Sequence, residues 1–213
     1  DDAGIMCRVW VSWSLHALGY ADQAQAIADE ALALGVTGSS ALVRTEAWLY
    51  ATAYQVRIRD YDTCRVHCAE LGAIAVELDF RVFQALGKIY LGWVRASQGD
   101  EDGVDAIRGG IAEWRATGSS TAAPAFLAML AEGCIATGRT TEALDATAEA
   151  IAMSEETGAK HSTAELYRLR GDALLQRHGT AAVHTPRRPK SPTGAQSRWP
   201  RSSVPRLGSC APR

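Results

Sequence analysis

The chain has 213 residues, a length that suits one ordinary domain or one repeat array. Its formal net charge is −2, but the charge is unevenly distributed. Seven of the 22 Lys and Arg follow Arg177, where there is no acid, so the chain up to Arg177 carries 15 basic and all 24 acidic residues. An acidic body of this kind argues against nucleic acid as its partner.

The sequence also gives no sign of a membrane partner or of secretion. Its longest apolar run, about ten residues around 122–131, is shorter than the roughly 20 residues that cross a bilayer. No charged-then-apolar signal peptide opens the chain. Five cysteines at irregular spacing fit reduced thiols better than a disulfide framework. We therefore expect a cytoplasmic protein.

The chain begins at Asp1 without an initiator methionine and enters a helical pattern almost at once, so we expect a piece of a longer protein. The part up to Arg177 is Ala-rich and holds one proline, Pro124, at the start of an expected helix, where proline is tolerated. Apolar residues at helical spacing predict an all-α fold of antiparallel helix pairs. The expected helices are 4–18 with 21–36, 40–58 with 61–77, 81–98 with 101–116, 121–137 with 140–156, and a ninth at 161–177.

Mostly small residues recur along these helices with a period of about 40 residues, a length typical of stacked helical repeats. One set, spaced 40, 39 and 40 apart, lies near the start of each second helix: Ala24, Cys64, Gly103 and Ala143. Another set lies seven residues further on: Ala31, Leu71, Gly110 and Ala150. The first helices carry a third set: Ser12, Thr52, Gly92, Ala131 and Gly171. Since small side chains let helices approach closely, this period predicts a stacked array of helix pairs.

After residue 178 the composition changes abruptly, because six of the seven prolines lie there with Arg, Ser and Gly and without a helical period. We expect residues 179–213 to form a disordered basic tail. Two explanations stay open. A native tail could contact nucleic acid or an anionic membrane weakly. An out-of-frame terminus is the other, favoured by the compositional bias of this segment.

The small-residue sets, the turn motif GRTTEAL and the segment GYADQAQAIADEALALG resemble tetratricopeptide repeats (TPRs). The usual TPR length is about 34 residues, shorter than the period here. The tryptophan typical of the repeat is present at the corresponding place only as Trp48. The resemblance covers about residues 4–178. It implies a TPR-like domain at 1–178 that forms a right-handed α-solenoid of about four and a half repeats.

Longer segments resemble the C-terminal helical arrays of bacterial multidomain proteins: GWVRASQGDEDGVDAIRGGIAEWRATGSS, FLAMLAEGCIATGRTTEALDATAEAI and AELYRLRGDALL. Those proteins carry a class III adenylate or guanylate cyclase domain, or a signalling ATPase domain, upstream; similar arrays occur in bacterial transcription activators. The resemblance implies a protein-interaction or scaffold module of a larger signalling protein. The alternative is the regulatory end of a cyclase, ATPase or transcription regulator. In either case the expected partner is a protein, a peptide or another domain of the parent chain.

No catalytic constellation is evident in the sequence. The chain has neither a GxxxxGK[ST] phosphate loop nor an HExxH motif. His16, His161 and His178 stand apart from any Ser or Cys with an acidic third member, so a nucleophilic triad is not indicated. We therefore expect no catalytic residue, no cofactor and no enzymatic turnover from this chain.

Cys64, His67 and Cys68 form the one cluster with metal-ligand residue types, since they share a helical face. These three soft ligands could hold zinc only with a fourth from elsewhere. However, Cys64 and Cys68 stand in register with Ala24 and Ala28, where a small packed residue is needed. Core packing is therefore the favoured interpretation, and we predict no metal site.

The resemblance implies that the first helices of the pairs line a concave groove. The register places these residues in or near it: Trp13, His16, Glu46, Arg57, Trp93, Glu132, Arg168 and Asp172. Trp13 and Trp93 occupy equivalent positions two repeats distant from each other. Exposed aromatic residues flanked by charges would anchor a bound peptide. The alternative is that both tryptophans fill the seams between repeats.

Overall fold

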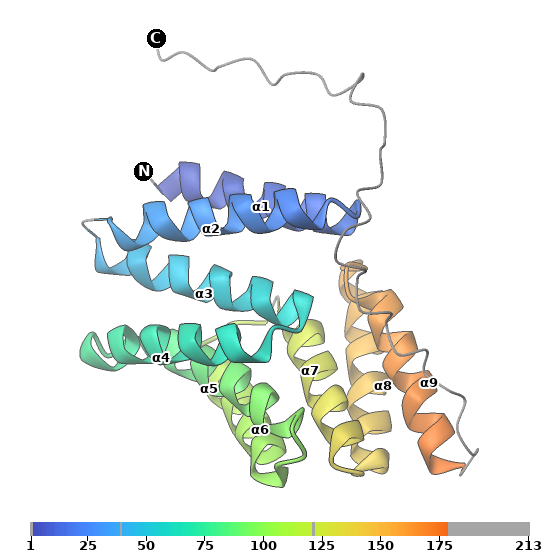
Figure 1. The fold of residues 1–213 in the computed structure, drawn as a ribbon. Helices are drawn as coiled ribbons and strands as arrows, with labels where there is room; N and C mark the ends of the chain where they lie inside the picture. The colour runs from blue at the N-terminus through green and yellow to red at the C-terminus, as the bar shows by residue number, and fades with distance from the viewer. Residues whose placement is uncertain (1, 39, 121, 179–213) are drawn as a thin grey trace, which may run out of the picture. The chain divides into compact units, whose positions relative to one another are not determined.

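A computed structural model describes residues 2–38, 40–120 and 122–178, which belong to one compact unit. Within these residues the chain forms nine α-helices and no β-strand (Figure 1). The helices are α1 (Asp2–Ala17), α2 (Ala21–Val36), α3 (Ala41–Ile58), α4 (Tyr61–Glu77), α5 (Arg81–Ala96), α6 (Glu101–Ala116), α7 (Ala123–Ala136), α8 (Thr140–Thr157) and α9 (Thr163–Arg177). The all-α prediction is confirmed, whereas the tail predicted at 179–213 lies outside the described residues.

The helices contact one another in a regular order. Each helix contacts the next one along the chain, from α1 with α2 to α8 with α9. Odd-numbered helices also contact each other, α1 with α3, α3 with α5, α5 with α7 and α7 with α9. Among the described helices, the backbones of even-numbered ones do not approach each other in this way. The unit therefore has an odd-numbered layer and an even-numbered layer. The contacts between consecutive helices agree with the predicted pairs, and the handedness and repeat number stay predictions.

The small-residue sets occupy the seams between helices, as the sequence predicts. All of their members are buried except Gly171 in α9, which is half-buried. The set near the start of the second helices is inaccessible to solvent at Ala24, Cys64 and Ala143. Gly171 has no atom within 4 Å of the place where a Cβ would lie, since the described residues include no helix after α9 to cover it.

Glycines bring α5 and α6 closest together in the middle of the unit. A Cβ on Gly103 would lie 2.4 Å from the Ala96 nitrogen and 2.7 Å from the Gly92 carbonyl oxygen. A Cβ on Gly110 would lie 2.7 Å from the Ile89 side chain. These distances are too short for a real Cβ, and at Gly103 the obstacle is backbone, which cannot rotate away. The crossing of these two helices therefore requires glycine.

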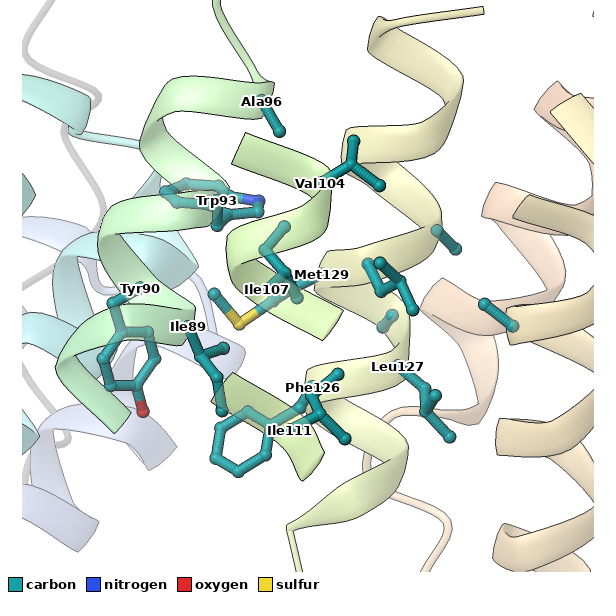
Figure 2. Packing of buried hydrophobic residues seen from close by; sticks show 14 of the residues in the cluster. Ile89, Tyr90, Trp93, Ala96, Val104, Ile107, Ile111, Phe126, Leu127 and Met129 are labelled. Carbon is teal, nitrogen blue, oxygen red and sulfur yellow. The ribbon is translucent and has the colours of Figure 1, made fainter. Parts of the chain in front are cut away.

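The main core lies against this crossing (Figure 2). Trp93 and Ile89 of α5, with Ile107 of α6, are completely buried. From α7, Phe126 packs edge-on against Trp114 at 5.0 Å between ring centroids. Pro124 lies in the first turn of α7, as expected, so it breaks no helical hydrogen bond. None of the described helices has the length and apolar character needed to span a membrane.

The turn inside each pair contains one residue with a left-handed backbone. In the first, third and fourth pairs this residue is Gly19, Gly99 or Gly138, with φ of 89°, 88° and 77°. The second pair has Arg59 at the equivalent place, with φ of 61°. A left-handed conformation costs a residue with a Cβ roughly 1–2 kcal/mol, whereas glycine adopts it readily. Arg59 therefore occupies a position at which the backbone conformation favours glycine.

The α5–α6 crossing gives a test with a matched control. Gly103→Ala should lower the free energy of unfolding by about 1–3 kcal/mol, because the added methyl meets backbone that cannot move. Gly87→Ala, within α5, places a methyl where no atom lies within 4 Å. That variant should be neutral or more stable by up to about 1 kcal/mol, since alanine favours the helix. Chemical denaturation of both variants measures the difference, and equal stabilities would contradict the close crossing.

Candidate functional site

All eight residues that the sequence assigns to the groove lie on odd-numbered helices. Trp13 and His16 lie on α1, Glu46 and Arg57 on α3, and Trp93 on α5. Glu132 lies on α7, and Arg168 and Asp172 lie on α9. They do not form one continuous site. They fall into two groups at different places along the odd-numbered layer, one aromatic and one charged.

We call the first group the aromatic cluster; it comprises Trp13, His16, Tyr50, Tyr54 and Arg57. It joins α1 to α3 through ring contacts. The ring centroids of Trp13 and Tyr50 are 6.4 Å apart, and those of His16 and Tyr54 are 6.0 Å apart, both edge-on. The Arg57 guanidinium carbon lies 4.6 Å from the Trp13 ring centroid, within the range of a cation–π contact. Trp13 and Tyr50 are partly buried, Arg57 is exposed and Tyr54 is buried, so Trp13, Tyr50 and Arg57 form the part of this cluster that faces solvent.

The tyrosines of the cluster lie in a low-polarity environment with acidic neighbours. Burial raises the pKa of Tyr50, and the negative charge of Glu46 raises it further. Burial likewise raises the pKa of Tyr54, with a smaller contribution from Asp29. Both phenols are therefore neutral at physiological pH, and the half-buried Tyr50 can donate a hydrogen bond to a ligand. Glu46 is thus part of the electrostatic surroundings of the cluster.

A small pocket lies beside the aromatic cluster between α1, α2 and α3. Its wall is formed by Ile5, Val9, Ser12, Trp13, Ala28, Ala31, Leu32, Ala47, Tyr50, Ala51 and Tyr54. Most of these residues are apolar and belong to the seam between the first two helix pairs. The pocket is therefore an imperfection of packing, and we assign it no ligand.

Trp93 differs from Trp13 although the two stand in the same register. Trp93 is completely buried, whereas Trp13 is partly exposed. The ring of Trp93 stacks beside Tyr61 at 4.8 Å between centroids. Its indole nitrogen donates a hydrogen bond of 2.9 Å to Oε2 of Glu132. The burial of Trp93 favours the alternative that this tryptophan fills the space between helix pairs. Trp93 therefore holds the Glu132 carboxylate in place and does not contact a ligand itself.

We call the second group the charged cluster; it comprises Arg59, Glu132, Glu165, Arg168 and Asp172. Arg59 pairs with Oε1 of Glu132, whose other oxygen already accepts from Trp93. Arg59 also pairs with Glu165 at 3.2 Å. Arg168 donates from Nε to Glu165 at 2.8 Å and from Nη1 to Asp172 at 2.6 Å. The structure therefore brings together three of the predicted groove residues, Glu132, Arg168 and Asp172.

The charges of this cluster stabilise one another. Burial alone would lower the pKa of Arg59, but the charge of Glu132 and hydrogen bonds with Glu132 and Tyr61 outweigh it, so the pKa is raised. A hydrogen bond to Glu165 raises the pKa of Arg168 against the effect of burial. Two arginines face three carboxylates, so the cluster has one excess negative charge. Sequence reasoning missed Arg59 and Glu165, although the register of Arg59 with Gly19, Gly99 and Gly138 would have identified Arg59 as unusual.

The Cys64, His67 and Cys68 cluster is a packed part of the core. All three residues are buried, and the His67 ring lies 5.2 Å from the Trp48 ring. A hydrogen bond with Cys64, together with burial, raises the pKa of Cys68, so its thiol stays protonated. Among the described residues, no group of three or more His, Cys, Asp or Glu side chains is placed to hold a metal ion.

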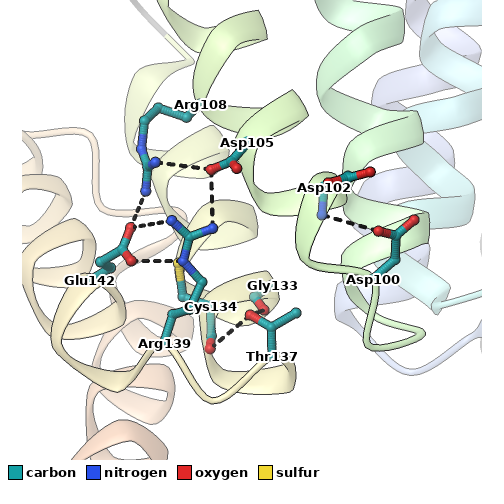
Figure 3. A network of polar contacts seen from close by, with 9 residues as sticks. All are labelled: Asp100, Asp102, Asp105, Arg108, Gly133, Cys134, Thr137, Arg139 and Glu142. Atoms are coloured by element: carbon teal, nitrogen blue, oxygen red, sulfur yellow. Dashed lines mark hydrogen bonds and ion pairs between the residues drawn. The ribbon is translucent and has the colours of Figure 1, made fainter.

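A further polar network joins the third and fourth pairs outside the predicted groove (Figure 3). Arg139 donates to Glu142 at 2.7 Å and to Asp105 at 3.0 Å. Arg108 pairs with Asp105 at 3.1 Å and also with Glu142. A hydrogen bond from Arg139 is the main cause that lowers the pKa of Glu142. The network connects α6 to the turn before α8 and to the first turn of α8. All of its members therefore join the third helix pair to the fourth, which is its neighbour.

The different burial of the two tryptophans predicts different effects of mutation. Trp93→Ala should lower the free energy of unfolding by about 3–5 kcal/mol, because it empties a fully buried space and removes the donor to Glu132. Trp13→Ala should cost clearly less, since part of the ring already contacts solvent. Urea denaturation of the two variants checks this, and a Trp93→Ala protein as stable as the original would contradict its place in the core.

His67 predicts a pH dependence of stability. Burial lowers its pKa below the ordinary 6.5, against a smaller effect of a hydrogen bond to the Ala51 backbone. In this range His67 binds a proton more readily in the unfolded chain than in the folded chain. Its contribution therefore lowers the free energy of unfolding as the pH falls from about 8 to about 5. Relative to His67→Gln, the original protein should lose stability over this window. His161→Gln, an exposed histidine, is the control. A difference that is independent of pH, or zinc that raises Tm only in the original protein, would contradict the packed histidine.

No protein-family model matches the chain, and no curated protein matches its sequence. A role for the two clusters therefore has to follow from their own geometry and charge.

Proposed function

We propose that the helical unit is a protein-interaction module of TPR type, which binds a protein segment along its odd-numbered layer. The observation that carries this proposal is the aromatic cluster, where Trp13 and Arg57 face solvent beside the neutral, half-buried phenol of Tyr50. Rigid aromatic rings and arginine are the residue types that contribute most to protein interfaces.

The layered packing supports the same proposal. The odd-numbered helices approach one another closely, while the described even-numbered helices keep their backbones apart. Two layers with unequal spacing curve toward the closely spaced one, so the odd-numbered layer would be the concave side. Repeat arrays use such concave surfaces to hold extended or helical segments.

The chemistry of the two clusters suggests the kind of ligand. Trp13 and the half-buried Tyr50 suit an apolar or aromatic side chain, and Arg57 suits a carboxylate or a carbonyl oxygen close to it. The charged cluster has its arginines and carboxylates paired with one another, so it offers less free bonding capacity. We therefore assign the anchoring role to the aromatic cluster and expect a peptide ligand with an aromatic and an acidic residue near each other.

The wider setting rests on the sequence resemblance alone. The parent would be a cytoplasmic bacterial signalling protein, and the module would connect it to a partner or to its own other domains. The alternative is the regulatory end of a class III cyclase, a signalling ATPase or a transcription regulator. Both roles need no catalytic residue within this chain.

The proposal is tested with a random peptide library displayed on phage and selected on the purified full chain. Selected peptides are then synthesised and their Kd is measured by calorimetry. Replacing Trp13 and Arg57 together by alanine should weaken binding at least about tenfold, because hot-spot residues of this type each contribute more than about 1 kcal/mol. Arg115→Ala, on the even-numbered helix α6, is the matched control and should leave Kd unchanged.

Two results would contradict the proposal. One is a set of selected peptides that bind the Trp13 and Arg57 double variant as tightly as the original protein but lose affinity for the Arg115 variant. The other is turnover: phosphate release from ATP, or formation of a cyclic nucleotide, by the purified chain would show an activity that an interaction module lacks.

A further inference from the structure

Arg59 connects parts of the unit that are far apart in the sequence. It belongs to the turn between α3 and α4, yet it pairs with Glu132 of α7 and Glu165 of α9, which are 73 and 106 residues away. The backbone of α3 has its contacts with α1, α2, α4 and α5. The Arg59 side chain therefore reaches past the third helix pair to the fourth pair and to α9.

The other ion pairs between described helices have a shorter range. Arg8 with Glu30 and Lys88 with Glu113 lie within a helix pair, 22 and 25 residues apart. Arg115 pairs with Glu149 in the next pair, 34 residues away. Nearest-neighbour packing is the rule in repeat arrays, where each repeat contacts only the repeats beside it. The contacts of Arg59 depart from that rule.

The acceptors of Arg59 are held in place by the core. The side chain of Glu132 is only 19% exposed, and its second oxygen is fixed by the Trp93 indole, which is itself completely buried. Glu165 is fixed by Arg168, which is in turn held by Asp172. The Tyr61 ring, two residues after Arg59, packs against the ring of Trp93. Two carboxylates that already have other hydrogen-bond partners thus face the Arg59 side chain, which comes from the turn after α3.

We propose that Arg59 is an ionic latch that holds the second helix pair to the fourth pair and α9 and thereby sets the width of the odd-numbered face. Releasing it would let the array open between these parts, while the contacts between neighbouring helices remain. The latch goes beyond the interaction role proposed above and would operate whether or not a ligand binds there.

The choice of arginine at this position agrees with a latch. The three equivalent turns use glycine, which adopts the left-handed backbone without cost. Arginine gives up that advantage and gains a long, planar group that can bind two carboxylates at once. Because the guanidinium and Glu165 are partly exposed, salt should weaken the latch.

The test measures the distance between the two parts that the latch connects. Spin labels are attached to cysteines introduced by Ala69→Cys on α4 and Arg170→Cys on α9, both exposed. Exposed Cys7 and the tail residue Cys210 are replaced by serine, and the buried Cys64, Cys68 and Cys134 stay unlabelled. Pulsed electron paramagnetic resonance on the full chain then gives the distribution of distances.

The original protein should give one narrow distribution, and Arg59→Gln should give a broader one shifted to longer distance. Raising the salt from about 0.1 M to about 1 M, which shortens the screening length from about 10 Å to about 3 Å, should broaden the distribution of the original protein but leave that of Arg59→Gln unchanged. Arg59→Lys should restore part of the narrow distribution, since its single ammonium can pair with one carboxylate at a time.

Two control variants separate the latch from general stability. Arg59→Gly places the residue of the other turns at this position, so it should keep or raise Tm and still lose the narrow distribution. Arg139→Gln breaks an ionic network of similar size between neighbouring pairs and should leave the distribution unchanged. Arg59→Gly with the distribution of the original protein would overturn the latch, and so would an equal broadening in Arg139→Gln.

Discussion

The close approach of paired helices is the constraint on which the rest of the structure depends. At Ala24, Cys64, Gly103 and Ala143 the second helix of each pair meets the first with no solvent between them. At Gly103 the neighbouring backbone leaves no room even for a methyl group. Because these positions recur at nearly equal spacing, each pair presents a similar shape to the next, and stacking follows from the repetition.

The different spacing within the two layers decides which side chains can connect the pairs. In the odd-numbered layer the helices are close enough for rings and short side chains to touch, as Trp13 with Tyr50 and Tyr90 with Phe126 do. In the even-numbered layer the gap between α6 and α8 is crossed by long charged side chains, Arg108 to Glu142 and Arg115 to Glu149. Ring contacts therefore connect neighbouring helices of the odd-numbered layer, whereas ion pairs connect α6 and α8; this is the reason that we propose the odd-numbered layer as the recognition face.

Much of the fold could be predicted from the sequence. The predicted helix ends lie within two residues of those observed, and the small-residue sets lie in buried seams. The helix ends and the small-residue sets both follow from the regular spacing of apolar and small residues, which can be seen directly in a sequence. Only the half-buried Gly171 departs from its set, since burial there requires a further helix and not only the residue itself.

The candidate site was less predictable. Trp13 and Trp93 share one register, yet the second is covered by Tyr61 and by the pairs on both sides, whereas the first lies on α1. Arg59 and Glu165 gain their role from a contact over 106 residues, and no local pattern encodes such a distance. Register was enough to place all eight residues on odd-numbered helices, but the division into an aromatic and a charged cluster came from packing.

The three glycines at the α5–α6 crossing also affect how the unit comes apart. They allow the tightest backbone contact in the middle of the chain, and Gly133 of α7 adds a further close contact with Ala96 and Ile107. Among the odd-numbered helices, α1 and α9 contact fewer other helices than α3, α5 and α7 do. Because α9 is also held by Arg59, heating should loosen α1 first and melt the glycine crossing last.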